Sequence, residues 1–406
     1  MDRAVKQLVK SGAGNSNAYE RSEYYDFGFE YFGPFLYGFT RWLSERLKEE
    51  GLTNVFFFSR DGYMMQKAFE LLEPDFPKTK YVSFSRKSLR QSLLWQCDGF
   101  AESLRYLTYE NFISVGRLLD YYGFGEAART SIAEELSLDL AEDLPWATLS
   151  ENKTAEAIYT ALEERIRKAS KEQYELLEAY LDQIGMEGRV AIVDIGWIGS
   201  MQYALEQFAE ASGRDLSICG YYVGMNPENP VAGKTDGYLY TKDDLRLRKS
   251  LLCFFGGLEK LFQSLEGSTD GYERQGSAVV PVLAAYEYEG DETVQECIRA
   301  WQQGALDFVA YAASSKKAKK VRDLRAFAEP LVEFGKQPPL WGVKLFSFFY
   351  NVDGTKQYFV AQKPLWQYRP RELVHDLSNS VWKTGFMKSV LKVPFPYFKI
   401  YDILRK

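Results

Sequence analysis

Short apolar runs alternate with helical periods in the first hundred residues of the chain. The run VFFF at 55–58 is followed by the turn-forming sequence SRDG at 59–62 and then by a helical period in YMMQKAFELL. A short run of β-branched and aromatic residues next to a turn signal is typical of a buried strand. A second run of this kind, KYVSF at 80–84, predicts a neighbouring strand.

The same alternation returns in the middle of the chain. RVAIVD at 189–194 and LSICGYYV at 216–223 predict two further strands, with a helical period between them, and 237–240 predicts an edge strand. Strands separated by helix-length spacers indicate a parallel sheet. We therefore predict an α/β fold whose Rossmann-like parallel sheet is built from residues 21–98 and 185–275.

The remaining segments have a different pattern. Residues 99–184 carry 3.6-residue periodicity and predict a helical, cap-like insertion between the two halves of the sheet. Residues 276–406 predict a mostly helical C-terminal region, with helices at 293–313 and 319–334. The polar, glycine-containing residues 1–20 are expected to form a flexible lead-in.

The amino-acid composition limits the classes of function that the protein can have. The 406-residue chain has a net charge of −6, which argues against a general nucleic-acid binder. Its four cysteines have no metal-finger spacing, and we find neither a signal peptide nor an apolar run of membrane-spanning length, so we expect a cytoplasmic protein. The single histidine, His375, leaves one candidate for histidine-based catalysis. Aromatic residues reach 16%, which suits either sugar-stacking surfaces or a large aromatic core.

The C-terminal segment 381–406 interleaves basic and aromatic side chains. Its six lysines and arginines face one acid, Asp402. Such a segment can hold a protein at an anionic membrane, so we expect peripheral contact with the inner face of the membrane. The alternative is a solvated basic face packed on the body of the protein, and Pro394 and Pro396 prevent a continuous amphipathic helix.

Two predicted strands end in the same way, with an aspartate, a glycine and then a helix. One end carries Asp61-Gly62 and the other carries Asp194-Ile195-Gly196. Carboxyl ends of parallel strands lie at one edge of the sheet, where ligands bind. Two carboxylates there would suit Mg²⁺, which takes oxygen ligands and keeps several waters, so Asp61 and Asp194 are the predicted metal ligands. The alternative is that both aspartates cap helices and the glycines only turn corners.

Anion-binding groups are predicted beside these carboxylates. The helix that starts near Gly199-Ser200 would offer free backbone N–H groups to a phosphate. Ser85, Arg86 and Lys87, after the second strand, would add a hydroxyl and positive charge. Together these residues predict a phosphate-binding edge of the sheet.

The order of these motifs resembles the haloacid-dehalogenase-like (HAD-like) phosphohydrolase superfamily. FSRDGY is similar to its first motif, with Ser59 in the place of the nucleophile and Asp61 in that of the acid/base aspartate. YVSFS resembles the second motif through Ser83 or Ser85, and VAIVDIG resembles the fourth through Asp194. A serine cannot replace an aspartyl nucleophile that both attacks phosphorus and binds Mg²⁺, so the ordinary phosphatase reaction of the superfamily is not expected.

A closer resemblance is to HAD-hydrolase-like proteins of bacterial capsule and surface-polysaccharide biosynthesis. It covers roughly residues 20–275 and rests on the segments FEYFGPFLYGFTRWL, FFSRDGYMM, FSRKSL, VDIGWIGSMQ and LEKLFQSLEGSTDGY, in that order. The resemblance implies work on a phosphorylated or nucleotide-activated sugar. It also implies Arg60, Asp61, Asp194 and Glu259 as polar site positions.

We therefore expect an enzyme of surface-polysaccharide assembly with Asp61, Asp194 and Glu259 as catalytic residues and Mg²⁺ as cofactor. HAD-like phosphoryl transfer or hydrolysis follows the motif order, and glycosyl or glycosyl-phosphate transfer suits the missing nucleophile. A third hypothesis is a non-catalytic glycan-binding or scaffold protein. The predicted substrate-binding positions are Ser59, Arg60, Ser85, Arg86, Lys87, Gly196, Trp197, Gly199, Ser200 and Gln202.

Overall fold

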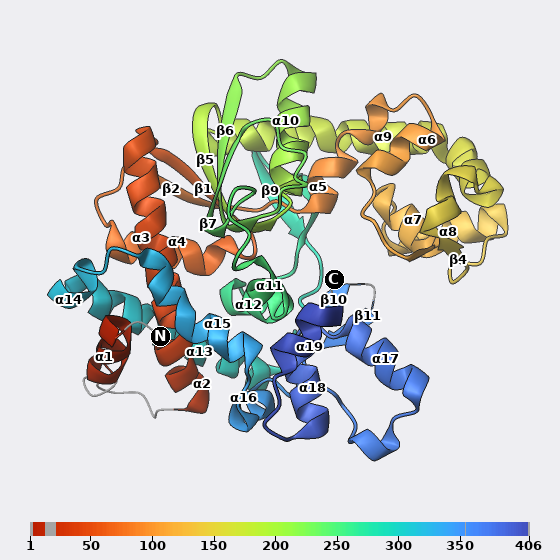
Figure 1. Cartoon of the computed structure of the whole chain (residues 1–406). Helices are drawn as coiled ribbons and strands as arrows, with labels where there is room; N and C mark the ends of the chain where they lie inside the picture. Colours follow the sequence, from red (N-terminus) through yellow and green to blue (C-terminus); the bar gives the residue numbers. More distant parts are fainter. Residues whose placement is uncertain (1–2, 13–21, 354, 405–406) are drawn as a thin grey trace.

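A five-stranded parallel sheet lies at the centre of the molecule (Figure 1). The computed structural model describes residues 3–12, 22–353 and 355–404. In spatial order the strands are β2 (Lys78–Val82), β1 (Asn54–Phe58), β5 (Gly188–Trp197), β6 (Leu216–Met225) and β7 (Lys234–Tyr240). The predicted α/β class and the parallel pairing of its strands are thereby confirmed.

The strand order creates a crevice between β1 and β5. The chain passes from β1 outward to β2, then returns through a long excursion to β5 on the other side of β1 and continues to β6 and β7. Phe57 of β1 pairs with Val193 of β5, so the carboxyl ends of the two strands lie side by side. In open α/β sheets, ligands bind outside the strand ends at such a reversal of strand order.

Alternate residues of β1 face two different cores. Val55 and Phe57 belong to the larger core, whereas Phe56 and Phe58 belong to the core on the opposite face. Successive side chains of a strand point to opposite faces, so a continuous apolar run is what a sheet covered on both sides requires.

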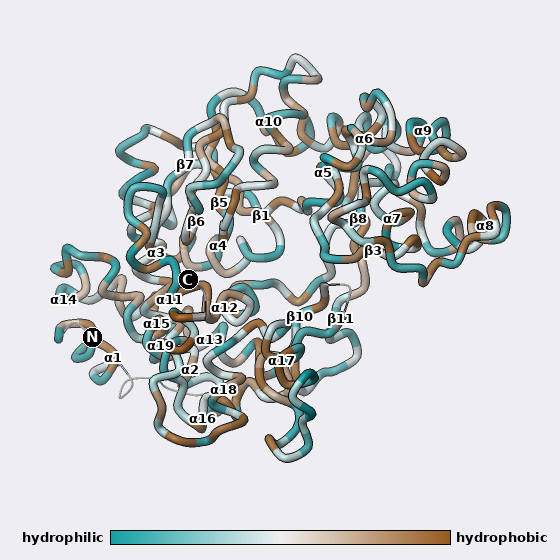
Figure 2. The backbone as a smooth tube through the Cα atoms, turned by 45° about the vertical axis from the view of Figure 1, so that its right-hand side comes forward, coloured by the Kyte–Doolittle hydropathy of each residue, from teal (hydrophilic) through white to brown (hydrophobic). Residues whose placement is uncertain are grey.

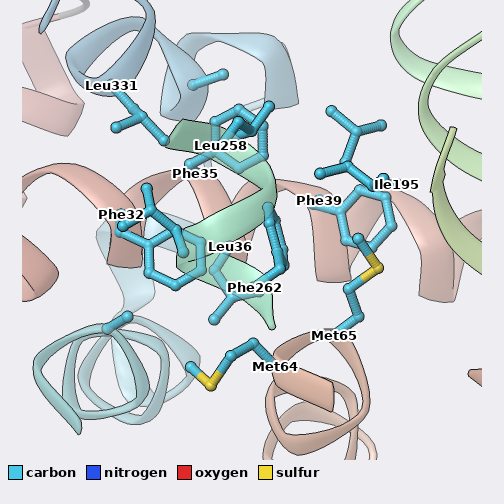
Figure 3. Close-up of a cluster of buried hydrophobic side chains, with 14 of the residues drawn as sticks. Phe32, Phe35, Leu36, Phe39, Met64, Met65, Ile195, Leu258, Phe262 and Leu331 are labelled. Carbon is cyan, nitrogen blue, oxygen red and sulfur yellow. The ribbon is translucent and has the colours of Figure 1, made fainter. Parts of the chain in front are cut away.

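The larger core is covered by α3 (Gly33–Glu50), α4 (Gly62–Leu72) and the C-terminal helices, including α13 (Glu292–Ser314). Many of its contacts are between aromatic rings. Phe262 packs edge-on against Phe32, with ring centroids 4.9 Å apart, and Figure 3 shows it among the side chains of α3 and α4. Much of the aromatic content therefore serves the core.

The opposite face is covered by α9 (Lys153–Ile184), α10 (Ser200–Ser212) and a hairpin of β8 (Thr269–Gln275) and β9 (Ala278–Leu283). The C-terminal part of α9 packs there through Leu177 and Leu181. Its N-terminal part, through Ile158 and Leu162, belongs to a third core in residues 94–166. The 32-residue helix therefore connects the sheet with a separate lobe, at the right of Figure 1.

The lobe has its own short elements. They are α6 (Phe100–Ser103), β3 (Phe112–Ser114), α7 (Val115–Tyr121), α8 (Glu126–Leu136) and β4 (Asp143–Pro145), and α5 (Arg86–Gln91) leads into it. The remaining elements are α1 (Arg3–Gly12), α2 (Glu23–Phe27), the π-helix Gly28–Phe32, α11 (Arg248–Leu252), α12 (Phe255–Phe262), α14 (Lys316–Lys319), α15 (Glu329–Lys336), α16 (Leu340–Leu345), β10 (Tyr350–Asp353), β11 (Thr355–Tyr358), α17 (Pro370–Asn379), α18 (Lys383–Leu391) and α19 (Tyr397–Leu404).

Some elements differ from the sequence-based expectation. The antiparallel strand pair β3–β4 lies in the predicted helical insertion, and the hairpin β10–β11 lies in the C-terminal region that was predicted to be mostly helical. The helix predicted at 319–334 is divided into a 3₁₀ turn at Leu324–Ala328 and α15. Within the predicted lead-in, residues 3–12 form α1, with Val5 and Leu8 buried in the larger core, and 1–2 and 13–20 lie outside the described residues.

The C-terminal segment packs much of its aromatic surface inward. Trp382, Phe386 and Tyr401 are buried, whereas Phe395 is exposed. Figure 2 shows apolar segments along the central strands and again around α18 and α19. Across the described ranges, no helix has the length and apolar character needed to cross a bilayer.

Candidate active site

A cleft of about 510 Å³ opens at the carboxyl ends of β1 and β5. It is lined by the turns that follow β1, β2 and β5, by α12, and by the β10–β11 hairpin. All the site residues predicted from the sequence line this cleft except Lys87, Gly199 and Gln202. The topology thus brings together segments that are more than 290 residues apart, such as Ser59 and Gln357.

Three carboxylates meet in the cleft, each from a different element. Asp61 follows β1, Asp194 lies within β5, and Glu259 lies on α12. Apolar residues within three positions of them in sequence share one cluster, which Figure 3 shows: Met64, Ile195 and Leu258. Because this cluster fixes three backbones at once, it holds the three carboxylates in place above it.

Asp61 carries a buried polar atom without a partner. The residue as a whole is partly exposed, but its Oδ1 is inaccessible to solvent and has no hydrogen-bond partner among the described residues. Burial raises the pKa of Asp61 well above its usual value, and the negative charges of Glu259 and Asp194 raise it further. The charge of Arg60 opposes this shift. An unpaired buried carboxylate oxygen is costly unless a proton, a cation or a ligand pairs with it.

Asp194 titrates close to neutral pH. Its side chain is 5% exposed and its Oδ1 accepts a 2.8 Å hydrogen bond from the N–H of Ile195. Burial raises the pKa of Asp194 to about 7, against the lowering effect of that hydrogen bond, and the charge of Glu259 adds to the rise. Both protonation states are therefore populated near neutral pH, as a general acid or base requires.

Glu259 is held by a tryptophan. Its Oε1 accepts a 2.9 Å hydrogen bond from Nε1–H of Trp197, whose ring is stacked on Tyr240 with centroids 6.2 Å apart and planes 5° apart. Burial raises the pKa of Glu259, and the bond from Trp197 and the charge of Arg86 reduce that shift. Trp197 is thus fixed at one edge by Glu259 and on one face by Tyr240.

Arg86 is the basic residue best placed to receive an anion. It lines the cleft, is exposed, and makes no hydrogen bond or ion pair with any other residue in the part of the chain that the structure describes. Its charge nevertheless lowers the pKa of Asp194 and of Glu259. Arg60, in contrast, is already paired: its Nη1 donates to Glu287 at 2.7 Å and to the backbone oxygen of Glu266 at 3.1 Å.

The two serines at the strand ends serve the backbone. Ser59 Oγ donates to the carbonyl of Phe84 at 3.1 Å and accepts from the N–H of the same residue at 3.2 Å. Ser85 Oγ donates to the carbonyl of Thr269 at 2.6 Å and accepts from the N–H of Ser88, which caps α5. Both hydroxyls therefore tie strand ends together.

The loop between β5 and α10 brings a helix N-terminus to the cleft. Gly199 has φ +65° and provides no side-chain cap, so the first N–H groups of α10 have no capping side chain. Ser200 and Met201 of this turn line the cleft. Gly196 has φ +124°, and a Cβ there would lie 2.2 Å from the carbonyl of Gly224, so only glycine fits.

Lys87 and Gln202 lie away from the cleft. Lys87 forms ion pairs with Asp120 at 2.9 Å and Asp270 at 2.7 Å in an adjoining cavity of about 340 Å³. Gln202 is fully buried: its Oε1 accepts from the hydroxyl of Tyr222 at 2.7 Å. Its Nε2 donates to Glu206 at 2.8 Å, so this amide joins α10 to β6.

Several cleft residues were not predicted. Gln263 and Ser268 lie within the motif segment LEKLFQSLEGSTDGY, and Gln263 follows Glu259 by one helical turn, a spacing that could have indicated it. Four others lie in a hairpin and a loop outside the motifs, where no sequence signal marks them: Asn351, Val352, Gln357 and Val381. His375 does not line the cleft; it is exposed and lies 3.2 Å from Asp376.

The carboxylates offer oxygen donors to a cation. No group of three or more His, Cys, Asp and Glu side chains among the described residues is arranged to hold a metal ion. Asp61 and Asp194 would supply two oxygen donors to such an ion, with water in its other positions, an arrangement in which Mg²⁺ is commonly bound. The unpartnered Oδ1 of Asp61 is a hard oxygen donor of the kind that Mg²⁺ prefers, so the residues fit this ion.

The chain matches no protein-family model, and no curated protein shows significant sequence similarity to it.

Proposed function

We propose that this protein is an enzyme of surface-polysaccharide biosynthesis that transfers or hydrolyses a phosphoryl group of a sugar phosphate or nucleotide sugar. One observation carries the proposal. Three carboxylates whose pKa values are raised by burial lie in one cleft with the unpaired guanidinium of Arg86: Asp61, Asp194 and Glu259. The HAD-like order of the sequence motifs supports the same reaction class. Perturbed carboxylates in a cleft at a sheet reversal are a recurring mark of active sites.

The proposed reaction is a direct displacement. The phosphate binds to Arg86 and to the first N–H groups of α10, and the sugar ring packs on Trp197. The attacking hydroxyl or water gives its proton to Asp194 as its oxygen bonds to phosphorus. The bond from phosphorus to the leaving oxygen breaks, and Glu259, whose pKa burial raises, gives that oxygen a proton. No covalent intermediate forms on Ser59, because its hydroxyl already bonds to the backbone of Phe84.

Asp61, through its unpartnered Oδ1, is the residue that would hold Mg²⁺ in this site; Asp194, the second predicted ligand, would bind the cation only when it is not acting as the base. A bound divalent cation would neutralise charge on the phosphoryl oxygens. A magnesium titration followed by thermal unfolding tests this: wild type should gain about 2.7 kcal/mol at a hundredfold excess over Kd, and Asp61→Asn should gain almost nothing. Glu164→Gln, an exposed carboxylate on α9, should respond like wild type.

Glycosyl or glycosyl-phosphate transfer is the second candidate. The hydroxyl of Ser59 is already bonded to the backbone of Phe84 and is not free to act as a nucleophile. This favours an inverting transfer to a sugar hydroxyl, which needs a base but no protein nucleophile. In hydrolysis of a sugar 1-phosphate in ¹⁸O-labelled water, phosphoryl chemistry places the label in phosphate, whereas attack at the sugar carbon places it in the sugar. The isotope shift in the ³¹P spectrum distinguishes the two.

The test of enzymatic function is turnover of a panel of sugar 1-phosphates and UDP-, GDP- and CDP-sugars with Mg²⁺. Asp194→Asn should lower kcat by about 10²–10⁴-fold, the usual contribution of a general acid or base, and Glu164→Gln should leave it unchanged. Absence of turnover with every panel member, together with equal ligand-induced thermal shifts in wild type, Asp61→Asn and Asp194→Asn, would favour a non-catalytic binding protein instead.

We further propose peripheral contact with an anionic membrane through the end of the chain. The support is a group of exposed apolar side chains, Leu391, Val393 and Phe395, close in sequence to Lys392 and Lys399. Apolar residues among lysines are the pattern of interfacial segments.

Co-sedimentation with vesicles tests this contact. Wild type should pellet with phosphatidylserine-containing vesicles and not with neutral ones, and Phe395→Ser should weaken the association. Trp366→Ser, which removes a more exposed aromatic residue elsewhere, is the control. Equal binding to neutral vesicles, or no effect of Phe395→Ser, would contradict the proposal.

A further inference from the structure

A second groove runs along the lobe. Its volume is about 880 Å³, larger than the cleft, and it is bounded by β3, β4 and the first turns of α7 and α8. Gln357 of the C-terminal β10–β11 hairpin contributes one wall. None of the site residues predicted from the sequence lines this groove, so the candidate active site does not account for it.

The groove adjoins the cleft. Arg117 lines both the groove and the adjoining cavity that holds Lys87, and that cavity shares Arg60 and Arg86 with the cleft. Gln357 lines the groove and the cleft directly. A chain-like molecule lying in the groove could therefore place one end at the carboxylates.

The groove walls combine exposed aromatic rings with unpaired polar groups. Tyr109 is 68% exposed and Phe112 is 59% exposed, although both line the groove. The carboxylates of Glu126 and Asp143 and the amide of Gln357 make no hydrogen bond or ion pair with another side chain in the described ranges. Rings that stack on the C–H faces of sugars, next to planar polar groups that bind hydroxyls, are the two features that a carbohydrate needs.

The charges of the groove argue against a polyanion. Its acids are Glu110, Glu126 and Asp143, and its bases are Arg117 and Arg129. Both arginines are already paired: Arg117 contacts Glu110 at 3.1 Å, and each has an ion pair with Asp120. A nucleic acid or a phosphate-rich polymer would need unpaired positive charge, which this surface does not offer.

We propose that the groove binds an uncharged oligosaccharide chain whose end reaches the cleft, which makes the substrate or acceptor of the reaction a glycan several sugars long. The claim that this glycan is a substrate or acceptor rests on the proposed function. The claim that the groove binds a glycan does not depend on it. The aromatic residues Tyr109 and Phe112 hold the chain, and Gln357 lies where the chain enters the cleft.

The experiment measures binding of the full-length protein to an array of defined oligosaccharides of graded length, neutral and anionic. Neutral members should bind, with affinity that rises with chain length. The double variant Tyr109→Ala/Phe112→Ala should lose about 30-fold in affinity, as expected for truncating the central contacts of an interface. Tyr109→Phe should retain binding, since it keeps the ring, and Trp366→Ala is the control for loss of an exposed aromatic outside the groove.

The outcomes separate the two proposals. If binding depends on chain length and is lost in the double variant, glycan binding by the groove is supported, even when no sugar phosphate is turned over. In that case only the proposed reaction is contradicted. Turnover of a short sugar phosphate without any glycan binding would overturn the proposed glycan binding and leave the proposed reaction standing. Preference for anionic members, or affinity independent of Tyr109 and Phe112, also overturns the groove proposal.

Discussion

The guanidinium of Arg60 forms a 2.7 Å ion pair with Glu287, a residue 227 positions further along the chain. Glu287 also pairs with the buried ammonium of Lys260, the residue next to Glu259. Burial alone would raise the pKa of Glu287, but the charges of Lys260 and Arg60 hold it below the usual value. One carboxylate thus fixes two cations behind the candidate active site.

Removing that carboxylate should strongly destabilise the protein. Glu287→Gln leaves Lys260, which is 2% exposed, and Arg60 without their countercharge. Breaking a buried ion pair from one side typically costs about 3–5 kcal/mol, and we expect a loss of this size in urea unfolding. Glu333→Gln, which breaks the exposed pair with Lys336, is the control and should cost less than about 1 kcal/mol. Equal losses in both variants would contradict the prediction.

Asp194 should make stability fall as pH rises between about 4 and 7. Its pKa is raised from 3.8 to about 7, so within this interval the folded state binds a proton that the unfolded state has released. Asp194→Asn removes this pH-dependent contribution to the free energy of unfolding. Relative to wild type, the variant should gain stability from pH 4 to 8, by up to about 4 kcal/mol at 1.36 kcal/mol per pKa unit. Chemical denaturation at a series of pH values measures the difference, and a constant offset across the series would rule out the shifted pKa.

Arg86→Ala should weaken binding of phosphate without weakening the fold. The guanidinium makes no hydrogen bond or ion pair with the described residues, so its removal breaks none of either kind. A charge-assisted hydrogen bond is worth about 1.5–3 kcal/mol, which predicts an increase of about 10- to 150-fold in the inhibition constant of inorganic phosphate. Arg322→Ala, an exposed arginine outside the cleft, should leave that constant unchanged.

Ser59→Ala should lower stability but retain turnover. The hydroxyl exchanges two hydrogen bonds with the backbone of Phe84, and its loss leaves a buried N–H and C=O unsatisfied. We expect a loss of about 1–3 kcal/mol in the free energy of unfolding. A kcat within tenfold of wild type would agree with a structural role, whereas complete inactivation of a folded variant would make Ser59 a catalytic group.

The central fold could be predicted from the sequence because its signals are local. The apolar runs of β1, β2, β5 and β6 are bounded by turn residues, and the helix-length spacers between them imply parallel pairing. The short antiparallel strands escaped prediction because each of β3, β4, β10 and β11 spans only three or four residues. A period of two cannot be established over so few positions.

The residue pattern alone predicted the site where an aspartate follows an apolar strand run. Asp61 and Asp194 carry that signal and both line the cleft, whereas Glu259 of α12, which also lines it, was indicated only by the family resemblance. Gln202 was misleading because it shares a motif with cleft residues, yet its position one turn into α10 directs it into the protein interior, where Tyr222 and Glu206 bind it. Contributions from Asn351 and Gln357 depend on how the C-terminal region folds back, which no local pattern records.

Helix α9 gives the lobe a mechanical connection to the cleft. Its Tyr180 hydroxyl accepts a 3.1 Å hydrogen bond from the N–H of Ser83, at the strand end that leads to Arg86. The opposite half of the same helix is built into the core of the lobe. Helix α9 thus links the core of the lobe directly to the strand end that precedes Arg86, and a displacement of the lobe would act on that strand end.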